Sequence, residues 1–293
     1  MTEKRPLNLL SHALVISMCA ALFSLSLACD SEEGAPSCDD ELVWDDDFIA
    51  SDPEDLEALA AYRRVAGDLT LTGTLQRVAE LGCLERVDGF LYLSQGELLD
   101  LRGLGNLSEL GSLYVSQMPN LTSFEGLEAV QTLDSLTVQL SGVESFQGLL
   151  GLETVRGRVH FHESQFQTMS GLGTLRTIGG GLTVNGFMTP LSLEGLAGLE
   201  SIGGNLDVQQ NAGLTSMSGL TQLQSVGGEL RVVNNAALTQ LELPELASLG
   251  GTLSIRSNES LPNCQALAIQ DQLVGAGWTG DSAIGSNSTA PCE

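Results

Sequence analysis

Aromatic side chains and lysine are scarce in this chain of 293 residues. Aromatic residues make up 4% of the sequence, and Lys4 is its only lysine. A single globular domain of this size usually fills a round core with more aromatic rings, so the scarcity favours a thin core of aliphatic side chains. The net charge of −25 would repel phosphate groups. We therefore expect no nucleic-acid partner and no electrostatic docking on anionic lipid.

The sequence also lacks the signatures of common catalytic and metal sites. It contains no Cys-x-x-Cys spacing, no nucleophile motif and no phosphate-binding loop. His160 and His162 could supply two metal ligands, but no third ligand has a predictable position. We therefore predict no metal, no cofactor and no catalytic residue. The competing enzyme class is a β-helix that acts on polysaccharides, and its only plausible cluster is Glu163, Asp207, His162 and Arg231.

The N-terminal region has the pattern of an export signal. Lys4 and Arg5 precede a long uncharged apolar stretch that ends in small residues just before Cys29. The stretch is long enough to span a membrane as a helix, but no basic stop-transfer segment follows it. We predict that residues 1–28 are a signal peptide and that residues 29–37 form an acidic tether of disordered composition.

Residues 26–29, Ser-Leu-Ala-Cys, resemble the lipoprotein box of bacteria. In that family the cysteine becomes the mature N-terminus and carries the lipid. Ser26 departs from the pattern, because the family usually has Leu there, and ordinary cleavage after Ala28 is the alternative. The resemblance implies lipidation at Cys29. The protein would then be exported and anchored to the bacterial cell envelope by lipid only, without spanning the membrane; otherwise it would be secreted.

Four further cysteines lie in two pairs, one near each end of the exported chain. They are Cys38, Cys83, Cys264 and Cys292. An even number of cysteines in an exported protein predicts disulfide bonds. Three connectivities are possible, and we favour Cys38–Cys83 together with Cys264–Cys292.

A pair of apolar residues two positions apart recurs nine times, at steps of 22 to 24 residues. The pairs are Leu69/Leu71, Leu91/Leu93, Leu113/Val115, Leu136/Val138, Val159/Phe161, Leu182/Val184, Leu206/Val208, Leu230/Val232 and Leu253/Ile255. The alternation within each pair indicates a β-strand with one buried face. A constant period of this length is typical of a solenoid, in which each repeat forms one coil.

The remainder of each repeat carries apolar residues three positions apart around a Gly-Leu dipeptide. Glycines inside this segment, such as Gly126 and Gly219, disfavour a helix, so we expect short extended pieces joined by corners. Glycine pairs such as Gly203-Gly204 and Gly227-Gly228 then turn the chain into the next strand, where φ is positive or backbones approach closely.

Both ends of the predicted solenoid carry a candidate cover, because an open terminal coil would expose its core and a strand edge. Residues 52–62 begin with Asp52 and Pro53, which are helix-start signals. Residues 265–273 have the composition of a second short helix. Trp44 and Trp278 lie in the two end regions and are suited to plug the core.

The whole pattern resembles the receptor L domain, the β-helical ligand-binding module of insulin- and EGF-type receptors. The resemblance is carried by Leu-x-Val-x-x-Asn at Leu206–Asn211, by the Gly-Leu segment of Gly219–Gly228, and by the tail with Cys264, Trp278 and Cys292. It implies an all-β, right-handed, single-domain β-helix of about nine leucine-rich-repeat-like coils over residues 38–292, with a short helix at each end.

The resemblance has limits. No cysteine-rich or kinase segment is present, so receptor signalling does not carry over. The near alternative is a leucine-rich-repeat horseshoe, which would need a regular helix or 3₁₀ turn in each coil; the glycine pairs disfavour it.

The outward side of the repeated strand is the best candidate binding face, because rigid strands hold its side chains in place. Its candidate residues are Tyr92, Tyr114, His160, His162, Asp207 and Arg231. The tyrosines should lie on adjacent coils, and Asp207 should pair with Arg231. We expect this face to bind an unknown protein or glycan without catalysis; a structural or adhesive envelope role is the alternative. Asn211, Asn235 and Asn258 share one position and should form a structural ladder.

Overall fold

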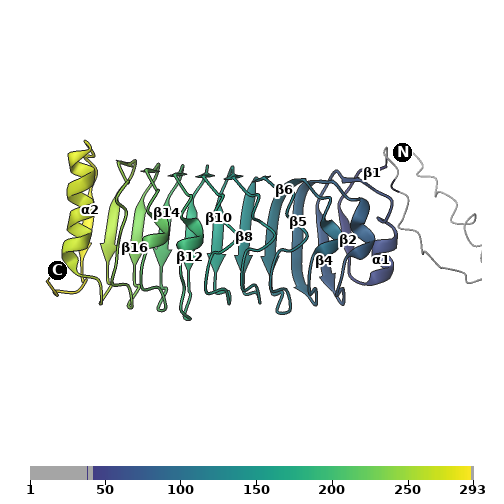
Figure 1. Cartoon of the computed structure of the whole chain (residues 1–293), viewed down its shortest axis with the longest axis horizontal. Coiled ribbons are helices and arrows are strands. Elements are labelled where there is room, and N and C mark those ends of the chain that lie inside the picture. The colour runs from purple at the N-terminus through teal and green to yellow at the C-terminus, as the bar shows by residue number, and fades with distance from the viewer. Residues whose placement is uncertain (1–37, 39–41, 292–293) are drawn as a thin grey trace, which may run out of the picture. The chain divides into compact units, whose positions relative to one another are not determined.

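The computed structural model describes residue 38 and residues 42–291, which form a parallel β-solenoid (Figure 1). The signal peptide, the Cys29 lipidation site and the tether all fall within residues 1–37, so these predictions lie outside the described residues. Within the described ranges, no helix has the length and apolar character needed to cross a membrane.

The main sheet contains one parallel strand from each coil. In sheet order its central strands are β4 (Leu69–Gly73), β5 (Arg86–Gly96), β6 (Glu109–Ser116), β8 (Ser135–Gln139), β10 (Val159–His162), β12 (Leu182–Asn185), β14 (Leu206–Gln209), β16 (Leu230–Val233) and β18 (Leu253–Arg256). All nine predicted apolar pairs lie side by side in register; Leu206 aligns with Leu230, for example. The predicted solenoid of about nine coils is confirmed.

The structure adds one strand at each end of this stack. Strand β2 (Phe48–Ala50) pairs with β4, and β19 (Ser282–Gly285) pairs with β18. Two short strands, β1 (Val43–Trp44) and β3 (Arg64–Val65), extend the sheet beside β5. The sequence did not predict these four strands, because none of them repeats the aliphatic pair at the regular spacing.

The prediction of short extended pieces after the main strand is wrong, because each coil makes 3₁₀-type turns there. Four of these turns are full 3₁₀ helices: η1 (Ala79–Cys83), η2 (Arg102–Leu104), η3 (Glu194–Leu196) and η4 (Ser218–Leu220). The other coils make the same bond three residues apart, as from Leu127 N to Phe124 O (3.0 Å). An apolar spacing of three matches the three residues per turn of this helix. The glycine argument against a leucine-rich-repeat solenoid therefore fails.

A second, six-stranded sheet follows these turns. Its strands are two residues long: β7 (Thr132–Leu133), β9 (Thr154–Val155), β11 (Thr177–Ile178), β13 (Ser201–Ile202), β15 (Ser225–Val226) and β17 (Ser248–Leu249). The glycine pairs come directly after the last four of these strands, β11, β13, β15 and β17. A Cβ on Gly203 would lie 2.2 Å from Gly179 O, and a Cβ on Gly227 would lie 2.2 Å from Gly203 O. Close stacking of successive coils, rather than positive φ, therefore requires these glycines.

The core is a narrow column of buried aliphatic side chains with an aromatic section in the middle coils. Five phenylalanines are fully buried there: Phe124, Phe146, Phe161, Phe166 and Phe187. Their neighbouring ring centroids lie 4.7–5.7 Å apart. Five of the aromatic residues thus pack together along the axis, a clustering that the repeat alone did not predict.

Helix α1 (Pro53–Glu57) is shorter than the predicted residues 52–62. Asp52 caps it, since its side chain accepts bonds from Glu54 N and Asp55 N. Beyond Glu57 the chain continues in tighter turns. Helix α1 therefore covers the first coils with a single helical turn, and its residue Leu56 is buried against them.

Helix α2 (Asn263–Gly275) is longer than the predicted residues 265–273 and covers the opposite end of the stack (Figure 1). Trp44 and Trp278 are partly buried against the core at the two ends. Trp44 contacts Phe48 edge-on at 4.9 Å, and Trp278 Nε1 donates to Gly251 O at 3.1 Å.

Cys38 is joined to Cys83 by a disulfide bond, with Cα atoms 5.4 Å apart. The bond links the start of the described chain to η1 and closes a loop of 45 residues around β2 and α1. Cys264 is also disulfide-bonded. Cys292, the partner we favoured for it, lies outside the described residues.

Removing the first disulfide should loosen the N-terminal coils before the rest. We expect Cys38→Ala/Cys83→Ala to lose about 4 kcal/mol of stability in denaturant unfolding, as the chain-entropy model gives for a loop of this size. Because each coil contacts only its neighbours, amide exchange should accelerate in β2 and β4 while β14 and β16 stay protected. Uniform acceleration along the solenoid would contradict this local role.

Candidate binding face

The six predicted face residues all point outward from the main sheet and are partly buried. Adjacent coils are about 4.8 Å apart, so the register fixes which side chains meet. Tyr92 aligns with Tyr114, and Asp207 aligns with Arg231. The histidines lie between these pairs on β10, separated from them by the strands β8 and β12. The structure therefore places the predicted residues on one face but in three separate groups.

The first group is a row of aromatic rings on β5 and β6. Tyr92 and Tyr114 meet edge-on, with centroids 5.5 Å apart. Phe90 stacks on Tyr92 at 4.8 Å with an interplanar angle of 14°. Gln139 Nε2 donates to the Tyr114 hydroxyl at 2.8 Å. Phe90 was not predicted as a face residue; its position two residues before Tyr92 places it on the same face only because the strand extends back to it.

Two carboxylates border this aromatic row. Asp68 Oδ1 accepts a bond from Phe90 N, and Asp47 Oδ1 accepts one from Asp68 N, both at 2.8 Å. Burial raises the pKa of Tyr92, and Asp68, Tyr114 and Asp47 raise it further. The two carboxylates therefore place negative charge beside the rings.

The second group consists of His160 and His162, whose rings lie 5.9 Å apart. His162 Nε2 is 3.4 Å from Glu163 Oε1. His162 Nδ1 and Asn185 Oδ1 are buried and have no hydrogen-bond partner within the described part of the chain. No cluster of three or more potential metal-ligating side chains occurs among residues 38 and 42–291. Burial lowers the pKa of His160, and His162 and Arg158 lower it further.

This lowered pKa predicts a pH-dependent stability. The folded state favours neutral His160, so its contribution is complete above the unfolded pKa of about 6.5 and is lost as the pH falls through the lower folded value. We expect His160→Gln to reduce the loss of melting temperature between pH 7.5 and pH 5. Thr137→Ser, at the same position of β8, should leave that loss unchanged. An unchanged pH profile in His160→Gln would refute the assignment.

The third group is the predicted ion pair of β14 and β16, which is confirmed. Arg231 Nε lies 3.5 Å from Asp207 Oδ1 and 3.9 Å from Glu229 Oε1. Gln209 Nε2 also donates to Asp207 Oδ1 at 3.0 Å. Burial is the main cause that raises the pKa of Asp207, and Arg231 opposes it. The pair is partly exposed and contributes at most about 1 kcal/mol.

Each main strand from β4 to β19 is closed by a residue with positive φ. These residues are Gly73, Gln95, Gln117, Leu140, Glu163, Gly186, Gln210, Asn234, Ser257 and Ser286. The sequence analysis did not detect this row, because the left-handed conformation is common only for Gly and Asn, which occupy three of the positions. In the last four coils the residue after it is an asparagine, and these asparagines form the ladder described next.

The predicted ladder of Asn211, Asn235 and Asn258 is present, and Asn287 extends it. All three predicted members are fully buried. Each side-chain oxygen accepts the backbone N–H of the preceding coil, as from Asn211 N to Asn235 Oδ1 at 3.1 Å. Asn287 Oδ1 accepts from Asn258 N in the same way. The ladder holds the coils in register and is not part of the exposed face.

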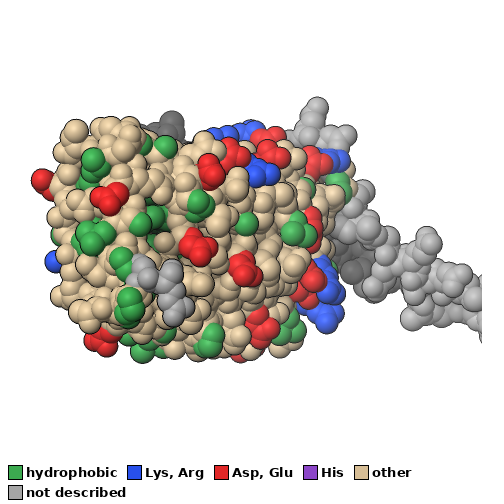
Figure 2. Space-filling model, turned by 60° about the vertical axis from the view of Figure 1, so that its left-hand side comes forward, with side chains coloured by type: hydrophobic (Ala, Val, Ile, Leu, Met, Phe, Trp, Pro, Cys, Tyr) green, Lys and Arg blue, Asp and Glu red, His purple; other side chains and the backbone are tan. Residues whose placement is uncertain are grey.

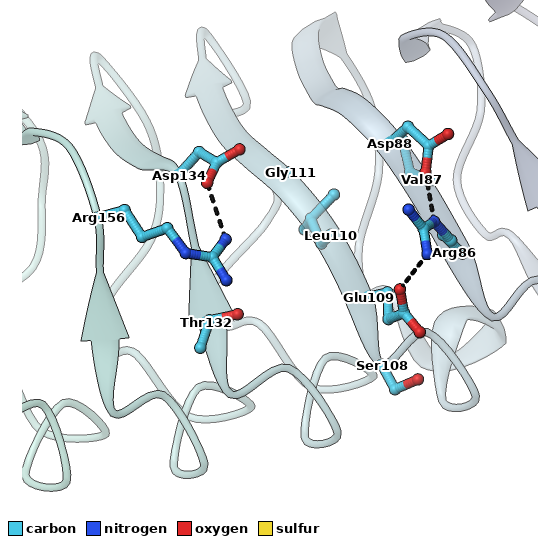
Figure 3. A pocket seen from close by; sticks show the side chains of 10 residues that line it. All are labelled: Arg86, Val87, Asp88, Ser108, Glu109, Leu110, Gly111, Thr132, Asp134 and Arg156. Atoms are coloured by element: carbon cyan, nitrogen blue, oxygen red, sulfur yellow. Dashed lines mark hydrogen bonds and ion pairs between the residues drawn. The ribbon is translucent and has the colours of Figure 1, made fainter.

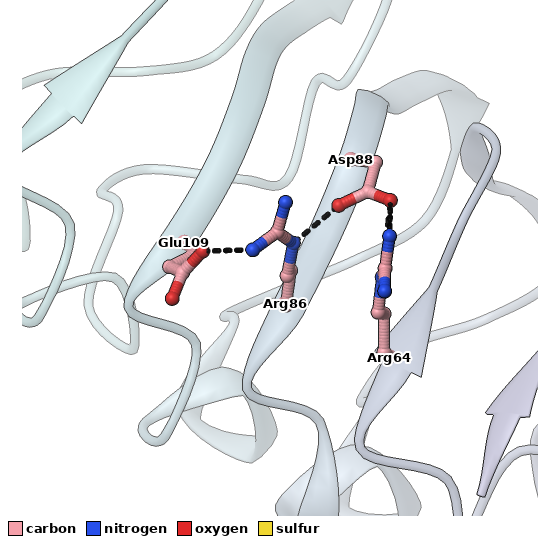
Figure 4. A network of polar contacts seen from close by, with 4 residues as sticks. All are labelled: Arg64, Arg86, Asp88 and Glu109. Carbon is pink, nitrogen blue, oxygen red and sulfur yellow. Dashed lines mark hydrogen bonds and ion pairs between the residues drawn. The ribbon is translucent and has the colours of Figure 1, made fainter.

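A small hollow of about 290 Å³ lies away from this face, beside the short strand segments. Figure 3 shows Arg156 turned toward Asp134, at 2.9 Å, and Arg86 turned toward Glu109. Figure 4 shows the chain of contacts from Glu109 through Arg86 and Asp88 to Arg64. Burial opposes ionisation of Asp88, but hydrogen bonds from Arg64 and Arg86 outweigh it and lower the pKa.

These charged side chains pair with one another, so we interpret them as a series of surface ion pairs and not as a ligand site. In Figure 2 most blue side chains lie toward the N-terminal coils, while red side chains are scattered over the visible surface. Pairs of this kind contribute little individually, and the two arginines that line the hollow, Arg86 and Arg156, are already paired.

Comparisons with known proteins give only distant structural likenesses. No family model and no curated protein matches the chain. An internalin from Listeria monocytogenes is 16% identical over 83% of this chain and 80% of its own, with a TM-score of 0.36. A leucine-rich-repeat protein from Leptospira interrogans is 14% identical over 76% of this chain and 91% of its own, with a TM-score of 0.25. The resemblance to the receptor L domain stays a prediction.

Proposed function

We propose that this chain is an exported, non-catalytic recognition module that binds a partner through the outward face of its main sheet. The observation that supports the proposal is the row of partly exposed aromatic, imidazole and amide side chains on in-register parallel strands. Lipid attachment at Cys29 would hold the module at the bacterial cell envelope, with the acidic segment of residues 29–37 as a spacer.

The face is suited to binding because its side chains are already ordered. Phe90, Tyr92 and Tyr114 contact one another, and Gln139 holds the Tyr114 hydroxyl. Aromatic residues offer a large contact area and lose little conformational entropy on binding. Strands fixed by neighbours on both sides keep these positions constant, which a loop surface would not.

The binding proposal is tested by screening the purified full chain against arrays of envelope and extracellular proteins and of glycans. Tyr92→Ala/Tyr114→Ala should weaken any specific binding at least about tenfold, in the range of an interface hot spot. The control is Arg102→Ala/Glu125→Ala, which removes an exposed ion pair outside the main sheet. Binding that survives the tyrosine substitutions would reject this face.

The anchoring proposal is tested separately in a bacterial host. Labelled palmitate should enter the wild-type chain and not Cys29→Ser. Equal labelling of the two chains would remove the lipid anchor but would leave the binding proposal standing.

A further inference from the structure

We propose that Phe90, Tyr92 and Tyr114, bordered by Asp47 and Asp68, receive an arginine or lysine side chain from a basic segment of a partner protein. This inference rests on the function proposed above and specifies the chemistry of the partner. These five residues are called the aromatic platform below.

The aromatic platform lies on a continuous outward row of the sheet. Register places Ile49 beside Thr70, Thr70 beside Tyr92, and Tyr92 beside Tyr114. Ile49 is 66% exposed. The row therefore runs from the apolar side chain of Ile49, through the small side chain of Thr70, to the rings of Tyr92 and Tyr114. An extended segment of a partner could lie across several coils in contact with this row.

The charge at the platform favours a cation. Asp68 and Asp47 are among the causes that raise the pKa of Tyr92, and no arginine or histidine is among them. Aromatic faces attract guanidinium and ammonium groups, and the attraction increases when carboxylates lie nearby. The platform thus combines a ring face and negative charge within reach of one side chain.

The two carboxylates are fixed in place but not neutralised. Each uses one oxygen to accept a backbone N–H from the next coil. Neither forms an ion pair with any arginine or histidine in residues 38 and 42–291. Asp207 on β14, by contrast, is paired with Arg231. The charge of Asp47 and Asp68 therefore remains available to a partner.

The same features favour a basic protein segment over a neutral glycan. A neutral sugar could stack on the rings, but it would leave both carboxylates without a charged partner. The chain carries a net charge of −25, which attracts a basic partner over distances of about a Debye length. The distal group of Asp207 and Glu229 already contains a cation, Arg231, and it has no aromatic ring beside it.

The test uses NMR titration of the full chain with two synthetic peptides at 150 mM salt. One is acetyl-Gly-Ser-Arg-Ser-Gly-Ser-Arg-Ser-Gly-amide, and the other carries Gln in place of each Arg. We expect the arginine peptide to bind at least about tenfold more tightly, corresponding to a cation–π contact assisted by charge. Its arginine δ-methylene protons should shift upfield because they lie over the tyrosine rings.

Three variants separate this contact from general attraction to an acidic protein. Tyr92→Leu/Tyr114→Leu should strongly reduce the upfield shift, because only the Phe90 ring of the platform remains. Asp47→Asn/Asp68→Asn should weaken binding about tenfold and keep the fold, because Asn205 Oδ1 makes the same bond to Glu229 N in another coil. Glu242→Gln/Glu245→Gln removes the same charge from exposed positions in the coil before β17 and should change affinity less than about twofold.

Equal affinity for the two peptides, absence of the ring-current shift, or an equal loss in the Glu242→Gln/Glu245→Gln variant would overturn the inference. If the array screen nevertheless gives a tyrosine-dependent partner, such as a neutral glycan, the proposed function stands without the basic partner. If array binding does not depend on the tyrosines, the proposed face fails as well.

Discussion

Gly126→Ala is expected to destabilise the solenoid by at least about 5 kcal/mol, in the exceptional range for a single substitution. Gly126 has φ of 114°, which L side chains rarely adopt. A Cβ at this position would lie 1.9 Å from Leu101 O and 2.3 Å from Leu101 C. Both contacts are to the backbone of the preceding coil, so no side-chain rotation relieves them. The coils would have to separate locally, which would open the core.

The matched control is Gly173→Ala in the same type of segment. A Cβ on Gly173 meets no atom within 4 Å, and its φ is not positive. Stability in denaturant unfolding should stay unchanged or rise by up to about 1 kcal/mol, because alanine restricts the unfolded chain. If Gly126→Ala does not fold, its soluble yield and circular dichroism will show that directly. A folded Gly126→Ala variant within about 1 kcal/mol of wild type would contradict the stacking argument.

The repeat predicted the register correctly because burial constrains it. A strand with Leu206 and Val208 on one face can bury both only if the neighbouring pairs face the same axis. The turn segments were predicted less well. Glycine was taken as evidence against any helix there. In the structure Gly126 is needed because the coil below approaches it, while the chain around it still makes 3₁₀ bonds.

The sequence predicted which side chains of the candidate face point outward, but not which of them contact one another. Alternation along a strand determines that Tyr92 and His160 point outward. It does not determine that Phe90 joins Tyr92, since that depends on β5 extending back to Arg86. Asn287 was missed for a related reason, because α2 is inserted before β19 and interrupts the constant spacing.

The second large effect is expected for Asn235→Ala, which should cost about 4 kcal/mol, since several buried polar groups lose their partners at about 1–3 kcal/mol each. Asn235 is fully buried. Its oxygen accepts from Asn211 N and Asn211 Nδ2, both at 3.1 Å. Its nitrogen donates to Val208 O at 2.9 Å and to Asn258 Oδ1 at 3.2 Å. Alanine can replace none of these bonds.

The control is Asn205→Ala, which removes one exposed hydrogen bond to Glu229 N and should cost at most about 1 kcal/mol. Denaturant unfolding of both variants, read by circular dichroism, measures the difference. The double variant Asn211→Ala/Asn235→Ala should lose at least about 1 kcal/mol less than the sum of the two single variants, because the residues share bonds. Strict additivity, or a loss in Asn235→Ala no larger than that in Asn205→Ala, would show that the ladder does not hold the coils together.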